Sequence, residues 1–374
     1  MGMVEKQEIF FDSTRGENVK PQKRRGLPKF YYPLVIAILL AEAVALGFIL
    51  FDIFPLGKTF EIYSYAQYGQ YVSATQVKDI AVTVTRWFFF LLTAGVLIPT
   101  TLIIIMELTR RVIIARTGEV NAWDDEFNWL DKVDKKAAPA SQKERVQGDY
   151  IVRFDIHQRI QHYLLMGSFI ILAVTGLLRG FPNWPTFAWF TNVFGGPDAL
   201  RLVHDVAAFI MIADGIYHLI YIFYAWIVKK KSPSAMFPRM KDLKDIIHTS
   251  LWIFGLHKHE PEYDHFQYGQ KIDYWAIFWG MPVMVITGII MMFASYFSHY
   301  IGGQWFAVLA TAHRDEAVLA TGFILIVHMY YGHLQTTAFP VNTVMFTGKM
   351  LKSKYKEWFG REYAQITGEG EGEK

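Results

Sequence analysis

Six long apolar segments constrain this chain more than any other feature of its sequence. They lie at residues 31–54, 81–106, 159–181, 200–228, 272–297 and 317–339. Each is long enough to cross a hydrocarbon core about 30 Å thick as a helix. In lipid, backbone polar groups need internal partners, which only helices and closed barrels provide. The sequence therefore predicts an all-α membrane protein, with a four-helix transmembrane bundle and two additional N-terminal transmembrane helices.

Lysine and arginine are distributed unevenly between these segments. The stretches 1–30, 107–158, 229–271 and 340–374 hold seven, nine, eight and six of them, whereas 55–80, 182–199 and 296–316 hold two, none and one. Cytoplasmic loops of membrane proteins carry the excess of positive charge. We therefore expect a multi-pass protein of the inner (cytoplasmic) membrane with both termini in the cytoplasm.

The polar stretches divide the chain into four parts. We assign 1–116 to a cytoplasmic arm with two transmembrane helices, 117–152 to a cytoplasmic linker, 153–350 to the four-helix domain and 351–374 to a cytoplasmic tail. The linker is predicted from its mixed charge and its Pro-Ala-Ser break. The net charge of only +3 favours no particular partner. The bilayer is the expected surroundings, and no nucleic-acid partner is expected.

Two of the apolar segments carry histidines at two levels. His313 and His328 are 15 residues apart, about 22 Å along a helix and about 60° beyond four full turns. His204 and His218 are 14 residues apart, about 40° short of four turns. A single membrane histidine is often a packing residue. Two helices that each carry histidines at two levels indicate instead two haems, one above the other, inside a haem-binding helix bundle.

The chain contains no cysteine. This excludes disulfides, Cys-ligated iron–sulfur clusters and covalently attached haem from the chain itself. Any such group in an electron path must therefore belong to a partner subunit.

Several short motifs follow one another within residues 153–350. They are RIQHYLLMGSFIILAVTG at 159–176, RLVH at 201–204, YGQK at 268–271 and HMY at 328–330. Their order and spacing resemble the dihaem cytochrome b subunit of membrane-bound formate dehydrogenases and nickel–iron hydrogenases. The resemblance implies two haem b groups in an electron-transfer subunit of a membrane oxidoreductase complex. The first two apolar segments lie outside it.

Carried over to this chain, the resemblance assigns an inner haem to His162 and His328 and an outer haem to His204 and His313. The chain departs from the family in the 15-residue spacing, where 14 is usual, and in the additional His218. The spacings also resemble the cytochrome b of quinol-oxidising complexes, in which His218 would replace His162. We favour His162 because its flanking arginine and Thr-Gly pair match the family motif.

Two further histidines lie near the inner haem level. His157 and His333 are each five residues, about 140° around a helix, from a favoured ligand, so we expect them to face away from it. Packing or proton transfer is the expected role, with a third haem as the open alternative. Small residues such as Gly176, Gly288 and Gly322 leave room for a macrocycle or for close helix packing.

The stretch QYGQK at the start of the fifth segment is the candidate quinone site, with Gln267, Gly269, Gln270 and Lys271. Gln270 offers an amide donor to a quinone carbonyl, and Gly269 allows a ring to approach the backbone. An ordinary helix start with interfacial Tyr and Lys residues is the alternative interpretation.

The function expected from these features is electron transfer across the bilayer between the quinone pool and a redox partner at the outer face. That partner would be an iron–sulfur or multihaem cytochrome subunit, because this chain has no soluble catalytic domain. A histidine-rich metal or proton transporter is the alternative. It is less favoured because transporters usually break their helices near the midplane of the membrane.

Overall fold

The computed structural model describes residues 30–48, 80–117 and 145–367, apart from 183, 231–232, 258–259, 262, 336–337 and 340. Among these residues, five helices are long and apolar enough to cross a membrane. They are α2 (Ile80–Thr117), α4 (Ile156–Gly180), α6 (Gly196–Ile227), α8 (Tyr268–Met292) and α10 (Gly303–Phe323) with its continuation. The all-α membrane fold is confirmed.

The first predicted span corresponds to α1 (Tyr31–Phe48), a shorter apolar helix. The rest of that span lies outside the described residues, as do most of the predicted linker and the end of the predicted tail. Shorter elements connect the long helices. They are α5 (Pro185–Val193), η4 (Pro233–Met236), α7 (Met240–Ile253), α9 (Ala294–Phe297) and α11 (Val344–Thr347).

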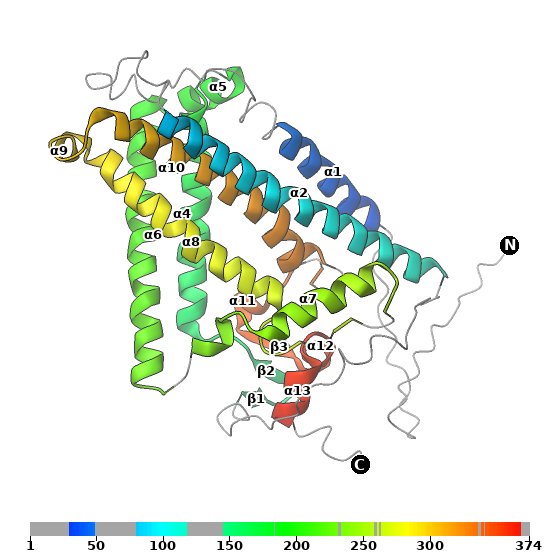
Figure 1. Cartoon of the computed structure of the whole chain (residues 1–374). Helices are drawn as coiled ribbons and strands as arrows, with labels where there is room; N and C mark the ends of the chain where they lie inside the picture. Colours follow the sequence, from blue (N-terminus) through cyan, green and yellow to red (C-terminus); the bar gives the residue numbers. More distant parts are fainter. Residues whose placement is uncertain are drawn as a thin grey trace, which may run out of the picture.

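Two helical hairpins form the bundle that surrounds the histidines. α4 packs along α6, and α8 packs along α10 (Figure 1). α10 also contacts α2 and α4, so it is the central helix of the bundle. The outer surfaces of the helices expose large apolar side chains such as Leu202, Phe209 and Ile220. Such a surface is stable in contact with lipid but not with water.

The N-terminal helices pack directly on the bundle. Tyr31 of α1, Leu97 of α2 and Phe323 of α10 belong to one buried cluster. A Cβ atom at Gly322 would lie only 2.7 Å from Cδ1 of Leu97. Gly322, for which the sequence allowed either a macrocycle or close helix packing, therefore serves helix packing. Hydrophobic burial and the close contact between α2 and α10 therefore stabilise the packing of the N-terminal helices on the bundle.

The last membrane helix begins earlier than the sequence predicted. α10 begins at Gly303, not at residue 317, so His313 lies ten residues inside the helix and not at its start. The part of α10 before residue 317, outside the predicted span, contains Thr311, Asp315 and Glu316. All three are buried in the bundle, with exposed fractions of at most 3%. Polar residues inside a membrane protein lower the hydropathy of a span without excluding it from the membrane.

A small folded unit, the cap, covers one end of the bundle. It consists of the antiparallel sheet β1 (Val146–Gln147), β2 (Tyr150–Val152) and β3 (Lys349–Leu351), followed by α12 (Lys352–Trp358) and α13 (Gly360–Thr367). Ile151 pairs with Met350 in the sheet. Residues 146–152, assigned to the linker, and 351–367, assigned to the tail, instead form this cap.

The cap is stabilised by apolar side chains that recur with the period of a helix. These are Tyr355, Trp358, Phe359, Tyr363 and Ile366, all buried, and most of them pack with Ile151 of β2 in one cluster. A surface helix with one apolar face needs a partner surface, which the sheet supplies.

Candidate functional site

His204 and His313 face each other between the two helical hairpins. Their ring centroids are 6.4 Å apart and the ring planes are inclined by 62°. His204 lies on α6 and His313 on α10, each on the second helix of its hairpin. The structure therefore brings together the two residues that the sequence assigned to one haem.

Thr175 and Thr287 fix the orientation of these two rings. Thr175 Oγ1 lies 2.9 Å from Nδ1 of His204, and Thr287 Oγ1 lies 2.9 Å from Nδ1 of His313. Each hydroxyl donates its own proton to the backbone carbonyl four residues earlier, at 2.7 and 2.6 Å respectively. Each histidine must therefore donate from Nδ1 and retain the lone pair on Nε2.

Glycines next to these threonines leave space for the rings. A Cβ atom at Gly176 would lie 3.3 Å from Cε1 of His204, and one at Gly288 would lie 3.2 Å from Cε1 of His313. Both distances are tighter than an ordinary van der Waals contact between carbon atoms, about 3.5–4.0 Å. The Thr-Gly pairs thus provide both the hydrogen-bond acceptor and the room that each imidazole occupies.

His162 and His328 form a second facing pair. Their ring centroids are also 6.4 Å apart, with the planes inclined by 37°. Nδ1 of His328 lies 3.1 Å from Oδ2 of Asp273 on α8. A carboxylate accepts, so His328 donates from Nδ1 and keeps the lone pair on Nε2. Sequence reasoning missed Asp273, although an ionisable residue in an apolar span is itself a signal for a buried partner.

His218 has hydrogen bonds on both ring nitrogens. Nδ1 lies 2.8 Å from Oε1 of Gln161, and Nε2 lies 3.1 Å from the hydroxyl of Tyr274. The amide oxygen can only accept, so His218 donates from Nδ1 and accepts the Tyr274 proton at Nε2. Both ring nitrogens of His218 are therefore hydrogen-bonded to protein groups. The ring of His162, in contrast, faces the ring of His328 directly.

A π-helical stretch accommodates the 15-residue spacing of the last span. After Phe323 the helix continues as η5 (Ile324–His328) and η6 (Tyr330–Leu334), both with π-helical hydrogen bonding. A π-helical turn closes an i→i+5 hydrogen bond and takes in about one more residue than an α-helical turn. The wider turn therefore offsets most of the rotation that an additional residue would give His328 relative to His313.

The same π-helical turn changes the position of His333. The sequence predicted that it faces away from His328, but the two ring centroids are 6.5 Å apart. This prediction is wrong because residues five apart share a face in a π-helix but not in an α-helix. His157, on regular α-helix α4, places Nδ1 2.6 Å from the hydroxyl of Tyr217.

Comparison with known proteins connects this arrangement to a family. The profile of the family described as prokaryotic cytochrome b561 matches residues 153–348, more than half of the 374 residues. The chain belongs to the prokaryotic cytochrome b561 family. It is therefore an integral membrane b-type cytochrome that takes part in electron transfer, and haem b is its implied cofactor.

Three relatives of this cytochrome are formate dehydrogenase subunits. The cytochrome b556 subunit of Haemophilus influenzae is 28% identical over 181 residues, covering 48% of this chain and 69% of the relative. Two subunits of Escherichia coli strain K12 are similar. The cytochrome b556(fdo) subunit is 27% identical (49% of this chain, 78% of the relative), and the nitrate-inducible cytochrome b556 subunit is 25% identical (48% and 76%).

The histidine pairs of this b-type cytochrome fit haem. Metal–imidazole bonds are about 2 Å long and a ring nitrogen lies about 1 Å from its ring centre, so two ligands across one iron place their centroids about 6 Å apart. Both observed separations are 6.4 Å. The Nδ1 donors of His204, His313 and His328 also leave Nε2 available for a metal. Outside such pairs, the described residues contain no group of three or more His, Cys, Asp or Glu that could hold a metal ion.

The QYGQK stretch of the cytochrome forms the first turn of α8 and the residue before it. Oε1 of Gln270 accepts from the backbone N–H of Gln267 at 3.2 Å and from a guanidinium nitrogen of Arg153 at 3.0 Å. Lys271 is buried and pairs with both carboxylate oxygens of Asp242 at 2.8 Å. A Cβ atom at Gly269 would meet no atom within 4 Å. Gln267 and Lys271 thus stabilise the helix start, while Gly269 borders open space.

Arg153 is a second residue that sequence reasoning missed. Its guanidinium is buried and lies 4.0 Å from the ring centroid of Phe359 in the cap. Its backbone N–H donates to the carbonyl of Gly348 at 2.8 Å. Arg153 therefore joins the cap to Gln270 at the start of α8. Arg159 of the RIQH motif similarly donates to the carbonyl of Phe346, at 2.7 Å, and ties α4 to the segment that leads into β3.

Proposed function

We propose that this cytochrome carries electrons across the membrane through two haem b groups and exchanges them with a quinone. His204 and His313 would hold the outer haem, and His162 and His328 the inner one. The observation that carries the proposal is the facing pair of imidazoles at each of two levels, with equal centroid separations of 6.4 Å. Haem b supplies reversible one-electron redox chemistry at each level.

The residues around the ligands would keep each imidazole in the state that binds iron. Thr175, Thr287 and Asp273 each accept a hydrogen bond from a ligand Nδ1. Such partners fix the tautomer and raise the basicity of the ligating nitrogen. His218 would not compete for the inner haem, because Gln161 and Tyr274 already occupy its two nitrogens.

The quinone would bind at the first turn of α8, next to the inner haem. Gln270 and Asp273 are three residues apart and share a face of α8, and Asp273 contacts the ligand His328. Gln270 has its oxygen occupied and can offer its NH₂ group to a quinone carbonyl. His157 and His333 lie at this level and would exchange protons with the aqueous side.

The orientation proposed from the loop charges places Gln270 on the cytoplasmic side of an inner membrane. The redox partner would then bind at the outer face and exchange electrons with the outer haem. That partner would be an iron–sulfur or multihaem cytochrome subunit. The relatives named as formate dehydrogenase subunits favour a larger oxidoreductase complex of that kind. Each electron moved inward works against about 2.3 kcal/mol per 100 mV of membrane potential.

Single substitutions of the histidines test this function. We expect His204→Ala and His313→Ala to lose only the outer haem, and His162→Ala and His328→Ala to lose only the inner one. Haem content per protein and a redox titration of the purified chain measure the result. His218→Ala is the matched control and should retain two haems. Retention of both haems in His162→Ala together with loss of one in His218→Ala would contradict the proposed inner ligands.

A further inference from the structure

Helix α7 has an inverted distribution of polar and apolar side chains. Asp242, Asp245, His248 and Thr249 face inward and are buried, together with Trp252 and Ile253 in the last turn. The opposite face exposes large apolar side chains: Met240, Leu243, Ile246, Ile247 and, directly after the helix, Phe254. Lys244 is the charged residue on that face. In water this arrangement would expose a contiguous apolar surface, which soluble surfaces avoid.

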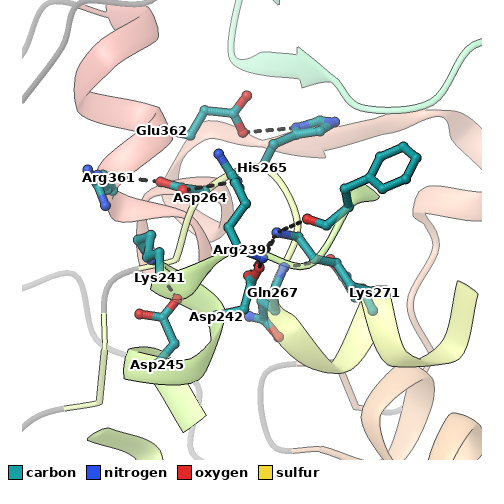
Figure 2. Close-up of polar contacts among 12 residues, drawn as sticks. Arg239, Lys241, Asp242, Asp245, Asp264, His265, Gln267, Lys271, Arg361 and Glu362 are labelled. Carbon is teal, nitrogen blue, oxygen red and sulfur yellow. Dashed lines mark hydrogen bonds and ion pairs between the residues drawn. The ribbon is translucent and has the colours of Figure 1, made fainter. Parts of the chain in front are cut away.

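The inward polar face of α7 is held by ion pairs and hydrogen bonds (Figure 2). Asp242 pairs with Lys271 in the first turn of α8 at 2.8 Å and accepts from the backbone N–H of Arg239 at 2.6 Å. Asp245 pairs with Lys241 at 2.6 Å. Beyond the helix itself, Thr249 Oγ1 lies 3.1 Å from the hydroxyl of Tyr263, and Nε2 of His248 lies 3.0 Å from Nδ1 of His257. The polar face is thus bonded to the rest of the protein, and the apolar face points outward.

The N-terminal end of α7 is linked to the cap through Asp264 and to α8 through Met236. Arg239 lies 3.3 Å from Asp264, which also lies 3.4 Å from Arg361 of α13 (Figure 2). The indole N–H of Trp275 on α8 donates to the carbonyl of Met236 at 2.9 Å. α7 is thus fixed at the level of the first two turns of α8, next to a span whose Ile272 and Trp279 are also exposed.

We propose that α7 lies in the plane of the membrane, with its apolar face in the acyl chains of the leaflet at which α8 begins. Three observations select lipid as the occupant. The apolar face lies beside a span that also exposes large apolar side chains, and Lys244 lies at the margin of that face, where a long side chain reaches phosphate headgroups. The face also consists of Met, Leu, Ile and Phe with one lysine, a composition suited to the acyl region below the headgroups.

The absence of cysteine makes the position of α7 directly measurable, since a single introduced cysteine is the only labelling site. Leu243→Cys and Ile247→Cys would carry a nitroxide label in the haem-loaded full chain, reconstituted in vesicles of phosphatidylethanolamine and phosphatidylglycerol. Ile220→Cys on α6 is the reference for a span, and Lys354→Cys on α12 is the reference for water. Haem content equal to that of the unmodified chain shows that each variant is folded.

Power saturation with oxygen and with a water-soluble nickel chelate decides the outcome. We expect both α7 labels to collide more often with oxygen than with the chelate, as the Ile220→Cys label does. Collision mainly with the chelate, as for Lys354→Cys, would place the face in water and overturn the proposal. Labels that are immobile and shielded from both reagents would show a protein segment or partner on this face, and would also overturn it.

Discussion

At the scale of single residues, the histidines proposed as haem ligands depend on acceptors that would not bind iron themselves. Thr175 can accept from His204 because its own proton is held by the backbone. We expect Thr175→Val to retain the outer haem but to raise its midpoint potential by about 20–60 mV, since about 59 mV corresponds to a tenfold change for one electron. Without the acceptor the imidazole donates less electron density to oxidised iron.

Thr175→Ser is the control for this prediction, because it preserves the acceptor oxygen. Redox titration followed in the visible spectrum measures both variants. Equal potentials for the Val and Ser variants would show that the hydrogen bond does not tune the haem.

Substitution of Gln270 tests the proposed quinone site, because hydrogen bonding to the quinone can be separated from capping of helix α8. We expect Gln270→Leu to leave both haems bound but to slow their reoxidation by quinone about fivefold to tenfold, the effect of one hydrogen bond of about 1–1.5 kcal/mol. Stopped-flow reoxidation of reduced protein by a soluble quinone measures the rate. Gln270→Glu keeps an acceptor for Arg153 and Gln267 but lacks the NH₂ donor. It should be slow as well, whereas a normal rate would assign Gln270 to capping alone.

At the scale of secondary-structure elements, the sequence was most informative where apolar runs were uninterrupted. The spans that became α2, α4, α6 and α8 were recognised because length and hydropathy suffice to define them. α10 began 14 residues earlier than predicted, because Asp315 and Glu316 are buried between helices. Hydropathy cannot distinguish a charged residue in a loop from one inside a bundle.

The facing histidine pairs were predictable, but their partners were not. Spacing places His204 and His313 on inward faces, whereas the bonds of His218 to Gln161 and Tyr274 depend on how α4, α6 and α8 pack. The π-helical turn was likewise outside the reach of the sequence analysis. The sequence indicated it only through the spacing of His313 and His328, which is 15 residues where 14 is usual in the family.

The π-helical turn gives a prediction for that additional residue. Leu325 lies in η5 and is exposed on the lipid side. We expect deletion of Leu325 to convert the turn to α-helix and to retain both haems, because the loss of one residue and the narrower turn offset each other. Insertion of one alanine after Ile324 should instead rotate His328 by about 100° and remove the inner haem. Haem quantification compares the two, and loss of a haem in the deletion variant would contradict this account.

At the scale of the whole molecule, the cap joins the two ends of the matched region. Arg145 in the turn before β1 pairs with Glu362 of α13 at 2.6 Å, and His265 lies 3.0 Å from the same carboxylate. Burial lowers the pKa of His265 to about 4, although Glu362 acts to raise it. Burial opposes the ionisation of Glu362, but hydrogen bonds from His265 and Tyr355 and the charge of Arg145 lower its pKa.

These shifts make the stability of the cap depend on pH. A histidine with a lowered folded pKa takes up its proton more readily when unfolded, so its contribution is present at pH 7 and is lost as the pH falls from about 6.5 toward 4. We expect the cap to lose on the order of 1–2 kcal/mol between pH 7 and pH 5. Deuterium exchange of residues 349–367, corrected for the intrinsic rate, measures it. His265→Gln should remove most of this dependence, and an unchanged dependence in that variant would exclude His265 as its source.

The matching Thr-Gly pairs give the two hairpins the same local arrangement. In each hairpin a threonine on the first helix accepts from a histidine on the second, and the following glycine borders the same ring. The outer pair therefore repeats one structural motif, once in each hairpin. The inner pair lacks this equivalence, because His162 comes from a first helix and His328 from a second. By its place on the second helix of a hairpin, His218 is the counterpart of His328. Two copies of an isolated α4–α6 hairpin would accordingly rebuild the outer site from His204 alone, and the inner site would have to use His218.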